Sequence, residues 1–141
     1  MKLARILVAI SGNVADESVI TLACSLAKKQ KAEIFVVYVI EVKRSLPLDA
    51  VVETEVDKAE MILTRAEDVA ADNDYEVETD LIQARDAGSA IVDEARERSV
   101  DLILMGMSHK MRFGMFDLGS AIPRVLEEAT CPVLVYRESE Q

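Results

Sequence analysis

The chain has 141 residues, half of them apolar, which is enough for one globular domain with a substantial core. Its 26 acidic side chains outnumber the 16 basic ones, giving a formal net charge of -10. Like charge opposes contact with a phosphate polyanion, so we predict no nucleic-acid binding. No apolar run reaches about 18 residues, and residues 1–10 read as a strand rather than an export signal, so we expect a cytoplasmic protein without membrane insertion.

The chain has two cysteines, and neither stands in a spacing typical of metal ligands. Cys24 and Cys131 lie inside or beside apolar patterns, so we expect both to be reduced, buried and inert. His109 is the single histidine and has no cysteine pair near it. We therefore predict no metal site.

The first half of the chain predicts a strand, a helix, a strand and a helix. Residues 5–10 form a continuous apolar run that turn formers end at 11–13. Residues 16–30 repeat apolar side chains at helical spacing, with acids first and lysines last. Residues 33–40 are a second apolar, β-branched run. In 52–70 an apolar stripe lasts under three heptads, which favours a helix covering a sheet over a coiled coil.

The second half continues this alternation. Residues 77–82 alternate weakly, as in an edge strand, and 87–98 carry apolar residues on one helical face. Residues 102–105 form another buried apolar run, 120–129 have helical spacing, and 133–136 read as a closing strand. We therefore predict five strands alternating with four helices.

Such alternation is typical of the α/β class. It predicts one domain over residues 1–141, an open twisted parallel sheet with helices on both faces, and right-handed crossovers. Ligands of such sheets lie beyond the carboxyl ends of the strands, where the winding direction reverses. If the first strand lies beside the fourth, the turn at 11–13 and the loop after Met105 meet there.

The segment from residue 106 to 121 has the features of a phosphate-binding backbone. Gly106 ends the buried strand, and Gly119 and Ser120 begin the next helix, where backbone N–H groups can hold an anion. The residues that we predict to contact a phosphate are Gly106, His109, Lys110, Arg112, Gly119, Ser120 and Ala121. The alternative is ordinary loop glycines, a plain helix cap and solvated cations.

The chain resembles the universal stress protein (UspA-like) family from Ile6 to Arg137. The ATP-binding branch has a glycine, two residues, a second glycine, nine residues, and a glycine followed by serine or threonine. Gly106, Gly119 and Ser120 match at the same spacing, and His109 stands at the second glycine. The resemblance implies strand order 3-2-1-4-5 in a Rossmann-like, adenine nucleotide alpha hydrolase-like fold.

The resemblance also implies that an adenine nucleotide binds where the first and fourth strands meet. ATP is the first candidate, and Mg is a candidate cofactor beside it. Ala9, Ile10, Val39 and Met105 then form an apolar slot for the adenine ring, although core packing explains each one singly. Ser11 stands where the family's ATP binders carry an aspartate facing the ribose, and serine lacks the paired carboxylate oxygens.

His109 leaves two alternatives open: its imidazole fills the phosphate space, or it contributes a hydrogen bond or charge to that space. A nucleotide-binding stress-response regulator is the leading hypothesis, and a degenerate interaction module that does not bind ATP is the alternative. We predict no enzyme, because no nucleophile has a recognisable base; slow ATP hydrolysis is the least favoured alternative.

The partners follow from the same resemblance. It implies a homodimer in which the last strand, Val133 to Tyr136, pairs edge to edge with its twofold mate. Residues 114–119, with Pro123 soon after, are similar to the variant that accompanies amino-acid permeases and ion antiporters. A membrane transporter is therefore a candidate partner.

Overall fold

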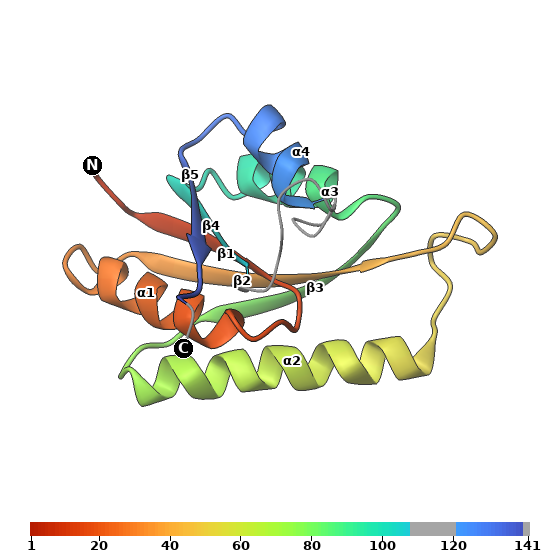
Figure 1. The fold of residues 1–141 in the computed structure, drawn as a ribbon, viewed down its shortest axis with the longest axis horizontal. Coiled ribbons are helices and arrows are strands. Elements are labelled where there is room, and N and C mark those ends of the chain that lie inside the picture. Colours follow the sequence, from red (N-terminus) through yellow and green to blue (C-terminus); the bar gives the residue numbers. More distant parts are fainter. Residues whose placement is uncertain (108–120, 140–141) are drawn as a thin grey trace.

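A computed structural model describes residues 1–107 and 121–139, which form a five-stranded parallel sheet between two pairs of helices (Figure 1). The strands are β1 (Arg5–Ile10), β2 (Glu33–Glu41), β3 (Glu78–Ala84), β4 (Leu102–Met107) and β5 (Val133–Arg137). The helices are α1 (Asp16–Lys28), α2 (Glu53–Asp72), α3 (Ala87–Glu97) and α4 (Ala121–Glu128). The strand order is β3-β2-β1-β4-β5, so the predicted α/β class and topology are confirmed.

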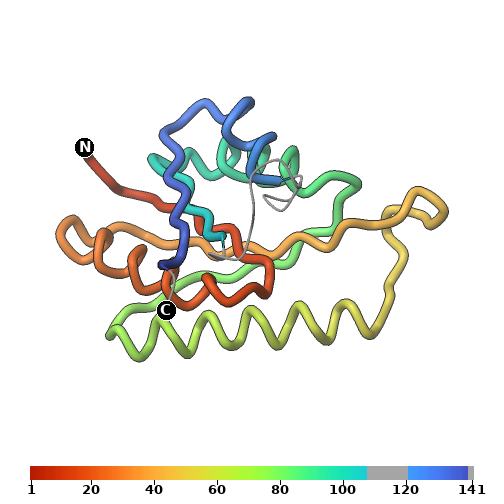
Figure 2. The backbone as a smooth tube through the Cα atoms, viewed as in Figure 1, coloured from red at the N-terminus to blue at the C-terminus, as the bar shows by residue number. Residues whose placement is uncertain are grey.

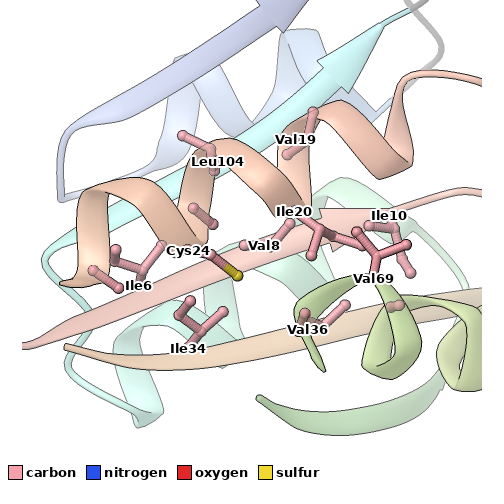
Figure 3. Close-up of a cluster of buried hydrophobic side chains, with 14 of the residues drawn as sticks. Ile6, Val8, Ile10, Val19, Ile20, Cys24, Ile34, Val36, Val69 and Leu104 are labelled. Carbon is pink, nitrogen blue, oxygen red and sulfur yellow. The ribbon is translucent and has the colours of Figure 1, made fainter. Parts of the chain in front are cut away.

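The two faces of the sheet carry separate apolar layers because successive side chains of a strand point in opposite directions. Ile6 and Val8 face α1 and α2, and Figure 3 shows them against Ile20, Cys24 and other side chains of that layer. Leu7 of the same strand belongs to the layer beneath α3 and α4. Because both faces are covered, the central strands read as unbroken apolar runs.

Strand β4 is longer than the apolar run predicted. It continues beyond Met105 because Gly106 and Met107 pair with Tyr136 and Arg137 of β5. The prediction that Gly106 ends the strand was therefore wrong. A Cβ atom added at Gly106 would lie 2.3 Å from Val19 Cγ2, so the missing side chain lets α1 approach the sheet.

The start of α3 is fastened to α4. The Asp86 carboxylate accepts a hydrogen bond from Ser89 N at 3.0 Å and lies 3.3 Å from Arg124 Nε. A Cβ atom added at Gly88 would lie 2.6 Å from the Arg124 Cβ, so the two helices are in close contact. Hydrogen bonds from Ser89 lower the pKa of Asp86, which keeps the N-cap charged.

The other predicted helices and strands agree with the structure. The predicted edge strand is β3 at the edge of the sheet, and the helix and strand bounds agree within about two residues. Both cysteines are free and Cys24 is buried, but Cys131 is only half-buried, so its predicted burial was wrong. Burial is the main cause that raises the pKa of both thiols, which disfavours the reactive thiolate.

The connection between β2 and α2 extends past the end of the sheet (Figure 2). The Gln83 side chain fastens it to β3 by donating to the carbonyl oxygens of Leu48 and Ala50, both at 2.9 Å. None of the helices within the described ranges has the length and apolar character required to cross a membrane.

We predict that Gly106→Ala lowers the free energy of unfolding by about 1–3 kcal/mol, measured by urea denaturation, because the new methyl group overlaps Val19. In open space within a strand the same change would stabilise by roughly 0.5–1 kcal/mol. The second variant, Val19→Ala, removes the overlapping atom. We expect the double variant to lose less unfolding free energy than the sum of the losses in the two single variants. Additive losses would contradict the close contact between residues 106 and 19.

Candidate functional site

A cavity of about 580 Å³ opens at the carboxyl ends of β1, β2 and β4, within the usual size of small-molecule pockets. It is bounded by α2 on one side of the sheet and by the first turns of α3 and α4 on the other. Its lining consists of Ala9, Ile10, Ser11, Asn13, Val37, Tyr38, Val39, Ile40, Glu41, Thr54, Glu55, Lys58, Ala87, Ile91, Met105, Gly106, Ala121 and Ile122.

The cavity brings together the predicted residues that the structure describes. These are Ala9, Ile10, Ser11, Val39, Met105, Gly106 and Ala121. The other five lie outside the described residues: His109, Lys110, Arg112, Gly119 and Ser120. The convergence of segments so far apart in sequence follows from the pairing of β1 with both β2 and β4. Which ligand they contact stays a prediction.

The apolar part of the cavity lies on the α3 side of the sheet. Ala9 is paired with Val37 of β2 and Met105 of β4, so these three side chains stand in one row. Ile91 and Ile122 close the row from α3 and α4. Ile10 points to the other face and packs with α1 and α2. The row forms a flat apolar floor with a small residue at its centre.

The β1–α1 turn forms the polar rim beside this floor. The Asp16 carboxylate accepts hydrogen bonds from Ser11 N at 3.4 Å and Gly12 N at 2.8 Å, which holds the turn closed. Gly12 has φ +82°, a conformation that other residues rarely adopt. Asn13 Nδ2 donates to Ser11 Oγ at 2.8 Å, so the Ser11 hydroxyl hydrogen remains available to a ligand oxygen.

Two titratable groups beside the turn respond to burial. Burial raises the pKa of Asp16 to about 6 from its ordinary 3.8, although the N–H groups of Gly12 and Ser11 act in the opposite direction. Burial also raises the pKa of Tyr38, with smaller contributions from the charges of Glu55 and Asp16. The Tyr38 hydroxyl is therefore neutral and lies within the field of two carboxylates.

Sequence reasoning missed the polar wall that faces this turn. Thr54, Glu55 and Lys58 of α2 line the cavity, as does Glu41 at the end of β2. Glu41 Oε2 accepts a hydrogen bond from Ala87 N at 2.8 Å, which ties the end of β2 to the start of α3. The helical pattern of 52–70 predicted α2. The sequence of the preceding connection, however, did not indicate which turn of that helix would line the cavity.

Comparison with known proteins identifies the family. The sequence profile described as the universal stress protein family matches residues 2–137. The chain belongs to the universal stress protein family. Universal stress protein YxiE of Bacillus subtilis is 30% identical over 146 residues, covering 94% of this chain and 98% of that protein. A universal stress protein of Methanocaldococcus jannaschii is 28% identical over 125 residues, covering 84% and 73% respectively.

Solved structures of universal stress proteins share the fold. One from Archaeoglobus fulgidus, solved in complex with dAMP, has a TM-score of 0.75 at 21% identity and covers 96% of this chain and 98% of its own. Another, in complex with cAMP, has a TM-score of 0.73 at 17% identity with the same coverage. UspA from Lactobacillus plantarum has a TM-score of 0.74 at 23% identity, covering 97% of this chain and 99% of its own.

Among residues 1–107 and 121–139, no group of three or more His, Cys, Asp and Glu side chains is arranged to hold a metal ion. In that part of the chain the site offers an apolar floor, a serine rim and one charged wall. These features suit an organic ligand with a flat ring and polar substituents.

We predict that Asp16→Asn changes the pH dependence of stability. A raised folded-state pKa means that the native state holds the proton more tightly, so this stabilisation is full below about pH 4 and is lost as pH rises through about 6. The unfolding free energy of the parent relative to Asp16→Asn should fall by up to about 3 kcal/mol between pH 4 and 7. Urea denaturation at several pH values measures this difference. The exposed Asp57→Asn is the control, and a constant difference for Asp16→Asn would contradict the prediction.

Proposed function

We propose that this universal stress protein is a stress-response regulator that binds an adenine nucleotide at the meeting point of β1 and β4, with ATP as the first candidate. The observation that carries the proposal is the cavity itself, where the ends of three parallel strands and the first turns of α3 and α4 converge. Two relatives of the same fold, solved with dAMP and cAMP, support an adenine nucleotide as the ligand class.

The described lining fits such a ligand. The row of Ala9, Val37 and Met105 offers a flat apolar surface on which a purine ring can lie. The Ser11 hydroxyl on the rim offers one hydrogen bond to a sugar oxygen. Ala87 and Ala121, the first residues of α3 and α4, keep the opposite side open because their side chains are small.

Serine at position 11 affects how tightly the site binds a nucleotide more than which class of ligand it binds. One hydroxyl replaces two carboxylate oxygens, so the sugar diol has fewer acceptors and we expect weaker binding than an aspartate would give. We further propose that the protein signals by nucleotide occupancy rather than turnover. Among the described residues there is no cluster of metal ligands, so there Mg would accompany a triphosphate through the phosphate oxygens and water.

A second candidate function is a dimeric interaction module. Strand β5 lies at the edge of the sheet, and Leu134 on it is 37% exposed. An edge strand offers unpaired backbone groups that a twofold mate can cover. We propose this pairing as the dimer contact, and a membrane transporter as a candidate partner for the regulator.

We predict that Ala87→Leu abolishes nucleotide binding while the protein stays folded, because the larger side chain fills the cavity from the first turn of α3. Isothermal titration with ATP, ADP, AMP and adenosine measures the binding, and thermal melting measures the folding. Ala90→Leu is the matched control, since Ala90 lies on the same helix and outside the lining. No heat or thermal shift with the parent at millimolar ligand would overturn the proposed function.

The double variant Ser11→Asp with His109→Gly separates the two candidate functions. If the parent binds no nucleotide and the double variant does, the interaction module is favoured. If the parent already binds, we expect the double variant to bind more tightly, because it restores the pattern of the family's ATP binders.

We predict that Leu134→Arg converts the dimer to a monomer, because a charge on the β5 edge opposes pairing with an identical charge. Multi-angle light scattering after gel filtration measures the mass. Met61→Arg is the control, since Met61 is 74% exposed on α2, and α2 packs against β2 and β3 at the other side of the sheet order from β5. A monomeric parent, or a dimeric Leu134→Arg, would contradict this interface.

A further inference from the structure

The wall of the cavity formed by α2 consists of polar and charged side chains. Thr54, Glu55 and Lys58 all line the cavity, and positions 54 and 58 are one helical turn apart, so their side chains share one face of the helix. All three are exposed. The helix α2 lies on the opposite side of the sheet from α3 and α4 (Figure 1), and residues of all three helices line the cavity.

Charge distinguishes Lys58 from the rest of the described lining. Two carboxylates line the cavity, Glu41 and Glu55, and among the described lining residues Lys58 carries the only positive charge. Tyr38 beside them is neutral, with its pKa raised by burial and by the Glu55 charge. Without Lys58, the charged side chains of the described lining would present only negative charge to an entering anion, in a chain of net charge -10.

The two carboxylates are not equivalent. Glu41 is engaged with Ala87 N at 2.8 Å, so its charge is partly compensated by the start of α3. Glu55 follows Thr54 directly and precedes Lys58 by one helical turn. In the part of the chain that the structure describes, Lys58 forms no salt bridge, so its ammonium group is available to a ligand.

We propose that Lys58, assisted by the Thr54 hydroxyl, binds the phosphate groups of the nucleotide from the α2 wall, and thereby selects phosphorylated nucleosides over free nucleosides. This inference rests on the proposed adenine-nucleotide function. An ammonium group on a flexible stem follows a phosphate chain, and hydrogen bonds between charged groups are stronger than neutral ones. Glu55 opposes the same phosphates, so the pair sets the strength of the preference.

The experiment compares adenosine, AMP, ADP and ATP by isothermal titration for the parent, Lys58→Gln and Glu55→Gln. We expect Lys58→Gln to weaken ATP and ADP about 5- to 20-fold and adenosine by less than about twofold. Glu55→Gln should act in the opposite direction and tighten ATP about 2- to 5-fold. Lys28→Gln, an exposed lysine in the last turn of α1, changes net charge equally and should leave all four affinities within about twofold.

The salt dependence of ATP affinity provides a readout that a merely structural role of Lys58 would not change. Because Lys58 is exposed, its attraction for phosphate is screened, so the ratio of parent to Lys58→Gln affinity for ATP should shrink between about 0.05 and 0.5 M salt. Equal losses for adenosine and ATP, or no loss, would overturn the role of Lys58 while leaving nucleotide binding intact. A parent that binds none of the four ligands overturns both proposals.

Discussion

The pairing of β1 with β4 determines where the rest of this molecule lies. The chain builds β1, β2 and β3 outward in one direction, then returns to add β4 and β5 on the other side of β1. Because parallel crossovers are right-handed, α1 and α2 cover one face and α3 and α4 the other. The reversal separates the connections that follow β1 and β4, and the cavity lies between them.

Much of this could be predicted from the sequence because buried parallel strands read as continuous apolar runs. The runs at 5–10 and 33–40 coincide with β1 and with most of β2. Strand β4 was cut short because Gly106 breaks the apolar run, and only its contact with Val19 shows why a glycine stands inside a strand. Strand order came from the family resemblance, since periodicity does not say which strands are neighbours.

The site was only half predictable for a related physical reason. Residues such as Ala9 and Met105 were found because they lie near the carboxyl ends of their strands, and those ends meet at one edge of the sheet. Lys58 was not predicted to line the site. Its position depends on where the connection between β2 and α2 places the start of α2 relative to the carboxyl ends of the strands. The capping of Ser11 and Gly12 by Asp16 was likewise hidden, since an acid at a helix start reads as a favourable dipole contact.

The charges around the cavity determine where an acidic chain offers positive charge at its surface. The first residues of α3 and α4 both line the cavity, so two positive helix ends face it. The amino-terminal end of α3 is already occupied by hydrogen bonds, because Ala87 N donates to Glu41 and Ser89 N donates to Asp86. Within the described residues, this leaves the start of α4 on one wall and Lys58 on the other as the groups that can receive negative charge.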